Sequence, residues 1–160
     1  MYLSGFYGDA RRAIKRAIEL RPQCYSALMT LSAILGELSL DDEQMLIFDR
    51  CIELCPHNPE AYADKAEALA VMSRFAEAEA LARKALVLHQ AYRYEDDFEE
   101  PTDASEVRDF TAVRIYTTLV YALDARGATE NVLTSIAEAK AFGIDESRFE
   151  HLCWPTLRAI

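Results

Sequence analysis

The chain has 160 residues, enough for one domain and too few for two. Its 51% apolar residues, 5 glycines and 5 prolines exclude a disordered, collagen-like or linker-like chain. The net charge of −10 argues against nucleic acid and anionic membranes as partners, because both are bound by clustered cations. No window is apolar enough to span a membrane and no signal peptide is visible, so we expect a cytoplasmic protein.

The first segment, residues 5–22, predicts a turn followed by one helix, because apolar residues recur at helical spacing and Pro22 follows the last of them. Four basic residues share about 140° of this helix, at about 100° per residue. They are Arg11, Arg12, Lys15 and Arg16. Two interpretations stay open: a solvated face, or a contact with an acidic segment of a second copy, which would give a homodimer through this N-terminal helix.

Two units of 34 residues, 25–58 and 59–92, then align without gaps. Each holds two apolar stripes at helical spacing, separated by a short polar break, and therefore predicts a pair of helices. The stripes are Leu28, Leu31 and Leu35, then Gln44, Phe48, Cys51 and Leu54, in the first unit, and Tyr62, Ala66 and Leu69, then Ala78, Ala82, Ala85 and Leu88, in the second. Asn58 is a good N-cap and Pro59 suits a first helical position.

The four cysteines predict reduced thiols, because a chain with this much core material does not need disulfide staples. Cys51, Cys55 and His57 are the strongest candidates for a zinc site. They lack the paired ligands that would complete a four-ligand set. We therefore predict no metal and no other cofactor, with Cys51 as a small buried residue and Cys55 as a turn residue.

Residues 93–112 interrupt the repeat and read as an acidic insertion. Its most distinctive part combines acidic and aromatic residues: Tyr94, Glu95, Asp96, Asp97, Phe98, Glu99 and Glu100. A loop of this length is typically functional or disordered. Three interpretations stay open: a solvated loop, an arm that covers the repeat or recruits a basic partner, and a calcium site, for which no EF-hand spacing is present.

The third complete unit covers residues 113–145, where the two stripes return with the same internal offsets. The final segment, 146–160, carries Phe149, Leu152, Trp154 and Leu157, which predict a helix that caps the last apolar face. Trp154 is interpreted as a core residue rather than a platform for a ligand. The chain is thus a single all-α domain of about three and a half helical hairpins.

The pattern resembles the tetratricopeptide repeat, a 34-residue helix–turn–helix that stacks into an α-solenoid. The first unit matches it at Leu28, Leu31, Ser32, Leu35, Phe48, Cys51 and Pro56, and the second at Tyr62, Ala66, Leu69, Phe75, Ala78, Ala82 and Ala85. By this resemblance, residues 5–22 are a closing half repeat. That leaves open a chain cut from a longer solenoid, a contact with another copy, or a helix that serves as its own cap.

The resemblance implies a non-catalytic scaffold or adaptor that holds a peptide segment of another protein in a concave groove. The groove-facing residues it implies are Met29, Ala33 and Glu37, then Ala63, Glu67 and Val71, then Thr117, Tyr121 and Ala125. This lining predicts an apolar or basic partner segment and lacks the cations that would clamp a C-terminal carboxylate. The alternative is a small acidic chaperone that shields an apolar client segment. An enzyme is not expected, because no nucleophile, phosphate-binding or metalloprotease signature occurs.

Overall fold

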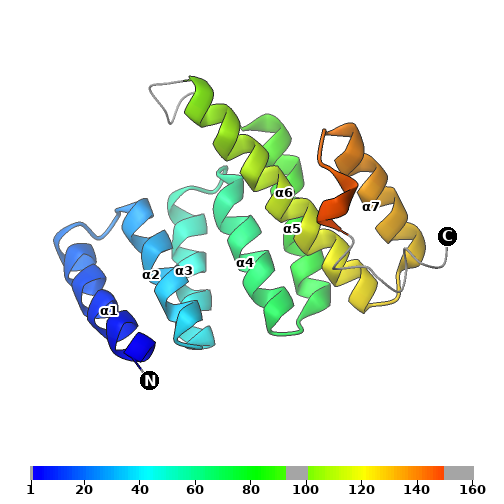
Figure 1. Ribbon diagram of the computed structural model, residues 1–160. Helices are drawn as coiled ribbons and strands as arrows, with labels where there is room; N and C mark the ends of the chain where they lie inside the picture. The colour runs from blue at the N-terminus through cyan, green and yellow to red at the C-terminus, as the bar shows by residue number, and fades with distance from the viewer. Residues whose placement is uncertain (1, 93–100, 150–160) are drawn as a thin grey trace. The chain divides into compact units, whose positions relative to one another are not determined.

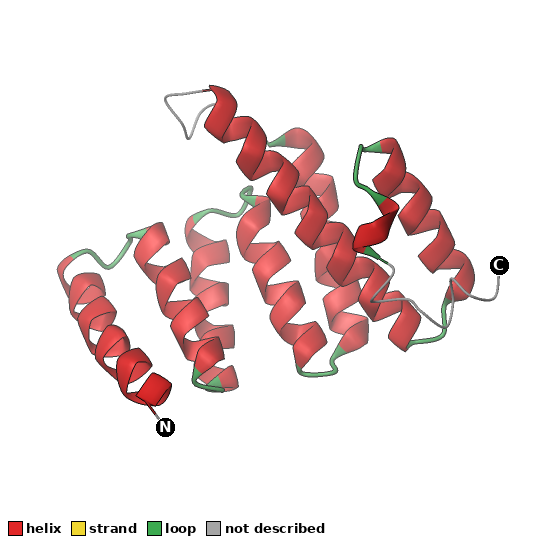
Figure 2. Ribbon diagram, in the orientation of Figure 1, coloured by secondary structure: helices red, strands yellow, loops and turns green. Residues whose placement is uncertain are grey.

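The computed structural model describes residues 2–92 and 101–149, and every regular element among them is helical (Figures 1 and 2). The predicted all-α fold is therefore confirmed for this part of the chain. The chain divides into two compact units, Met1–Ala61 and Tyr62–Ile160. Each unit is described by itself.

The first unit consists of α1 (Tyr2–Leu20), α2 (Tyr25–Glu37), α3 (Asp41–Leu54) and the first residues of α4 (Pro59–Val71). The second contains the rest of α4, α5 (Phe75–Ala91), α6 (Pro101–Ala125), α7 (Thr129–Ala141) and a short 3-10 helix, Glu146–Arg148. Helix starts recur at the predicted 34-residue interval, from Tyr25 to Pro59 and from Asp41 to Phe75. The predicted cap is confirmed, since the Glu60 N–H donates to Asn58 Oδ1 at 2.9 Å.

The turns inside the three hairpins share one backbone geometry. Each has a residue with positive φ just after the helix: Ser39 (52°), Ser73 (61°) and Gly127 (71°). The next N–H donates to a leucine carbonyl five residues earlier, at Leu35 (2.9 Å), Leu69 (2.8 Å) and Leu123 (3.0 Å). These bonds satisfy carbonyls at the helix ends that would otherwise lack a donor. The turn geometry thus repeats at the same intervals as the apolar stripes.

Ser39→Gly is expected to stabilise the protein by about 0.5 kcal/mol. Relief of the left-handed strain is worth about 1–2 kcal/mol, and the added freedom of glycine in the unfolded chain offsets about 0.5–1 kcal/mol of it. The measurement is urea unfolding followed by circular dichroism. Gly127→Ala is the converse test and should cost about 0.5 kcal/mol by the same two terms, because its Cβ would meet nothing within 4 Å and adds no steric clash. A loss of stability in Ser39→Gly would contradict this reading of the turn.

The core of the first unit lies between α2, α3 and the start of α4, with α1 packed alongside α2 (Figure 1). Leu28, Cys51 and Ala61 are fully buried, and Ile18 of α1 packs against them. The interpretation of Cys51 as a small buried residue is confirmed. Two turns earlier on the same face of α1, Arg11 donates to both carboxylate oxygens of Glu43 on α3 at 2.7 Å.

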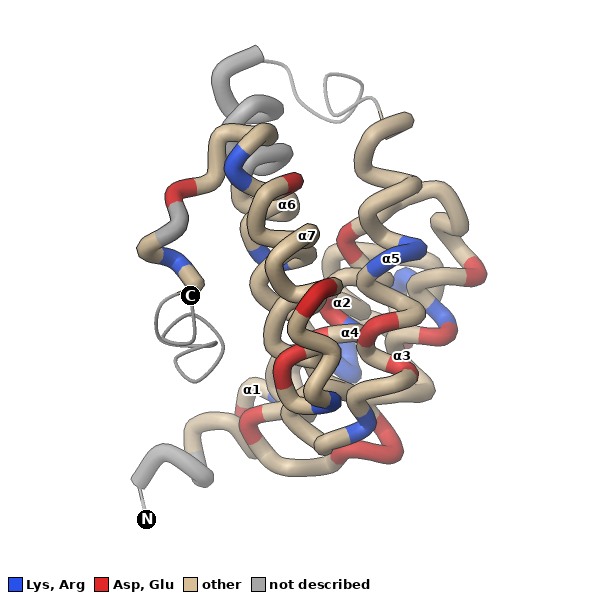
Figure 3. The backbone as a smooth tube through the Cα atoms, turned by 90° about the vertical axis from the view of Figure 1, so that its right-hand side faces the viewer, with Lys and Arg blue, Asp and Glu red and all other residues tan. Residues whose placement is uncertain are grey.

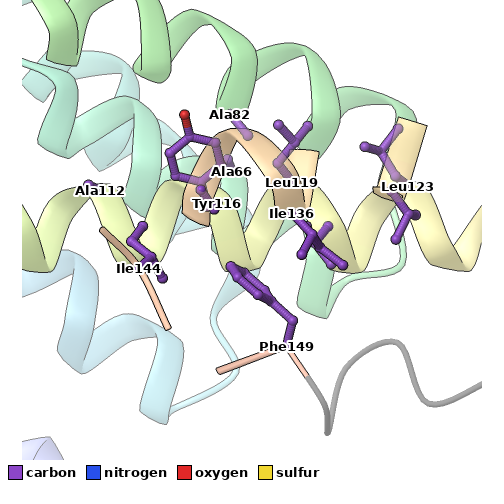
Figure 4. Close-up of a cluster of buried hydrophobic side chains, with 12 residues drawn as sticks. Ala66, Ala82, Ala112, Tyr116, Leu119, Leu123, Ile136, Ile144 and Phe149 are labelled. Atoms are coloured by element: carbon purple, nitrogen blue, oxygen red, sulfur yellow. The ribbon is translucent and has the colours of Figure 1, made fainter. Parts of the chain in front are cut away.

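The core of the second unit centres on α6, which packs against both α5 and α7 (Figure 4). Leu119 and Leu123 of α6 contribute large buried side chains, and Ile136 comes from α7. The small residues predicted at close helix approaches are all buried, namely Ala78, Ala82 and Ala85. After α7 the chain returns to this cluster and buries Ile144 and Phe149 in it (Figure 4).

Three predicted boundaries differ from the structure. Helix α1 begins at Tyr2, where the sequence predicted a turn near Gly5 before the helix. Helix α6 begins at Pro101, so residues 101–112 are helical rather than part of the insertion. Proline suits a first helical position, because its missing N–H would have no partner within the helix there. In the predicted capping helix, 146–160, residues Glu146–Arg148 form a 3-10 turn. The rest of that segment after Phe149, with Trp154, and the acidic stretch 93–100 lie outside the described residues.

Candidate peptide-binding surface

The predicted groove residues of α2 lie one helical turn apart and differ in exposure. Met29 is half-buried, because it packs against the cluster around Leu28. Ala33 and Glu37 are exposed. Ala33 and Glu37 therefore offer more accessible surface than Met29.

On α4 the first predicted residue must be corrected. Ala63 is buried, with 2% of its surface exposed, in a cluster with Ala85 of α5 and Ile115 of α6. It serves helix packing and cannot contact a peptide. Glu67 and Val71, one and two turns further along, are exposed, and Val71 is 79% exposed.

On α6 the solvent exposure of the three predicted residues again increases along the helix. Thr117 is half-buried, and its hydroxyl lies 2.9 Å from the Val113 carbonyl oxygen and 3.0 Å from that of Arg114. Because this hydroxyl is used inside its own helix, it is a poor donor to a ligand. Tyr121 and Ala125 are exposed, and the Tyr121 ring meets the Phe75 ring edge-on at 5.8 Å. Tyr121 is thus an exposed aromatic held by a neighbouring ring.

An arginine that the sequence did not single out joins the faces of α4 and α6. Arg114 Nη2 lies 2.9 Å from Glu67 Oε2, and the same guanidinium pairs with Asp64. Burial of Arg114 opposes its charge, but the charges of Asp64 and Glu67 outweigh burial and raise the pKa of the guanidinium above its ordinary value. The ion pairs fix α4 beside α6 within this unit.

The Phe110 ring completes this surface. It is 63% exposed, and the Arg114 guanidinium carbon lies 5.7 Å from its centroid, within cation–π range. We call this set the α4–α6 surface: Asp64, Glu67, Val71, Phe110, Arg114, Thr117 and Tyr121. It combines exposed apolar side chains with two carboxylates that share one cation.

A second concave feature of this unit lies between α5, α6 and α7 and was not predicted. It is an open pocket of about 710 Å³ whose lining includes Leu86, Val87, Tyr116, Glu138 and Phe142. Burial, and secondarily the charge of Glu138, raise the pKa of Tyr116. The sequence offered only a weak signal for this pocket, the apolar residues Val87 and Phe142 outside the main stripes.

The described residues offer little sign of catalytic or metal chemistry. Cys24, Cys51 and Cys55 form no disulfide with one another, and Cys55 lies at the end of α3 as predicted for a turn residue. Within residues 2–92 and 101–149, His, Cys, Asp and Glu side chains form no group of three suited to a metal ion. None of the described helices is both long and apolar enough to cross a membrane. Acidic and basic residues are interspersed along the helices (Figure 3).

Comparison with protein-family models and with curated proteins returned no match for this chain. The α4–α6 surface is therefore interpreted from its own chemistry and from the repeat pattern.

Proposed function

We propose that this protein is a non-catalytic interaction module, built of tetratricopeptide-like helical hairpins, that binds a peptide segment of another protein. The observation that carries the proposal is the α4–α6 surface, where Val71, Phe110 and Tyr121 expose apolar side chains beside Glu67. Exposed aromatic and aliphatic residues grouped with a few charges are typical of protein-binding surfaces. The repeated turn geometry supports the same assignment, because stacked hairpins commonly present such surfaces.

The chemistry of the surface favours a partner segment with apolar and basic residues. Asp64 and Glu67 carry two negative charges and Arg114 carries one positive charge, so the local balance is acidic. A lysine or arginine of the partner would approach Glu67, the more exposed carboxylate of the two. An apolar anchor of the partner would pack on Tyr121, whose edge-to-face contact with Phe75 orders the ring in advance.

The test is selection of peptides from a random phage-displayed library on the full chain, followed by calorimetry with the best synthetic peptide. We expect selected peptides to be rich in apolar and basic residues. Tyr121→Glu should abolish their binding, and Glu67→Lys should weaken it at least tenfold while favouring acidic peptides in a repeated selection.

The matched control is Val87→Glu, because Val87 is an exposed apolar residue of α5 outside the α4–α6 surface. Its affinity for the selected peptide should equal that of the wild type. Equal binding by wild type and Tyr121→Glu would show that the peptide uses another surface. Failure to enrich any peptide would argue against a peptide-binding module.

A further inference from the structure

Helix α1 has an outward apolar stripe in addition to the residues that pack against its neighbours. At about 100° per residue, the stripe occupies about 80° of the helix circumference. Its members are Phe6, Ala10, Ala13, Ala17 and Leu20. Phe6 and Leu20 are 69% and 71% exposed, and Ala13 and Ala17 are exposed between them. Large apolar side chains thus lie at both ends of an exposed run of small ones.

The stripe is symmetric about its centre, because Phe6 and Leu20 are each seven residues from Ala13. Consider a second copy of α1 that packs antiparallel, with the two-fold axis at Ala13. Phe6 of each copy then contacts Leu20 of the other copy, so the contact occurs on both sides of the axis. The alanines at the centre allow the two helix backbones to approach closely. A contact of this kind is self-complementary, as a two-fold interface requires.

The charges beside the stripe favour the same arrangement. Asp9 and Arg16 lie on one flank, four residues before and three residues after Ala13. In the antiparallel pairing Asp9 comes level with Arg16 of the second copy, to within about 1.5 Å along the axis. A parallel two-fold pairing would place this flank against the opposite flank of the second copy, where Tyr7 and Ile14 lie, so Asp9 and Arg16 would face no opposite charge.

The present partners of these two charges leave them available. Asp9 pairs with Arg12, and Arg16 with Glu19, within α1, and all four side chains are well exposed. Exposed pairs of this kind contribute little, so exchange for an intermolecular partner is not costly. The remaining cations, Arg11 and Lys15, face away from the stripe and pair with Glu43 on α3.

We propose that the protein forms a two-fold symmetric homodimer through antiparallel packing of α1 on α1 of a second copy. One helix from each copy makes a contact below the usual size of stable interfaces, so the dimer dissociates with a constant on the order of 1–100 μM. This self-association is separate from the peptide binding proposed for α4 and α6 and does not depend on it.

Sedimentation velocity of the full chain between about 1 μM and 1 mM tests the proposal. The wild type should shift from monomer to dimer across this range. Ala13→Glu should stay monomeric throughout, because it places two like charges at the two-fold axis. Ala33→Glu, the same change at an exposed position of α2, should dimerise as the wild type does, and circular dichroism should show equal helix content in all three proteins.

A charge-exchange pair of variants tests the antiparallel register. Asp9→Arg and Arg16→Asp alone should each associate at least tenfold more weakly than the wild type. Their equimolar mixture should form a heterodimer, because every facing pair is then of opposite charge. A wild type that remains monomeric at 1 mM, or an Ala13→Glu variant that dimerises normally, would overturn the proposal. So would equal self-association of both charge variants, or binding of α1 to phosphatidylserine vesicles in place of dimerisation.

Discussion

Leu119→Ala is expected to lower the free energy of unfolding by about 2–5 kcal/mol. Leu119 is fully buried in the C-terminal half of α6, in the cluster that joins α5, α6 and α7 (Figure 4). Truncation removes apolar contacts and leaves a cavity, because the surrounding helices are fixed by their own neighbours and cannot close around it. Urea denaturation followed by circular dichroism at 222 nm gives the free-energy difference.

The matched control for this prediction is Leu46→Ala on α3. Leu46 is 69% exposed, so the same truncation removes little buried surface and should change stability by no more than about 0.5 kcal/mol. A loss below about 1 kcal/mol for Leu119→Ala would contradict the assignment of α6 as the central helix of its unit.

Arg114→Met is expected to cost about 1–3 kcal/mol. Breaking a buried ion pair costs about 3–5 kcal/mol, and the remaining exposure of Arg114 (24%) and Asp64 (21%) reduces this through solvent screening. The variant leaves Asp64 and Glu67 facing each other across a partly buried site without a cation. Equilibrium unfolding at low and high salt measures the effect, which should shrink as salt rises.

A double-mutant cycle separates the ion pair from the loss of arginine packing. Asp64→Asn combined with Arg114→Met should be more stable than the sum of the two single losses predicts, because the uncompensated carboxylate is then gone. Arg74→Met serves as the control, since its pair with Glu77 is mostly exposed and should contribute about 0–1 kcal/mol. Additive effects of Asp64→Asn and Arg114→Met would show that the pair does not join α4 to α6.

Local patterns in the sequence predicted the helices and turns closely. Apolar residues at helical spacing, with Asn58 and Pro59 at a helix start, are enough to place the hairpins of 25–58 and 59–92. The same spacing identified the buried side of each helix, as at Leu28 and Ala82. These features depend on interactions within a few residues, which a single sequence expresses directly.

The accessible surface was harder to predict, because exposure depends on which helix lies opposite. Ala63 occupies the same repeat position as Met29 and Thr117. Helices α5 and α6 nevertheless bury it, so it cannot be part of a binding surface. No spacing pattern in the sequence around Arg114 indicated that it joins two helices. Its role comes from Asp64 and Glu67, about fifty residues earlier in the chain.

The sequence by itself therefore determined the helical class, the repeat interval and the turn positions, since these follow from backbone preferences and short-range apolar periodicity. Only the tertiary structure decided that Arg114 joins α4 to α6, that Ala63 is buried, and that α5, α6 and α7 line an open pocket beside Tyr116. Each of those features depends on contacts between side chains that are far apart in the sequence. Burial, charge pairing and the shape of a pocket are set by such contacts and not by local sequence patterns.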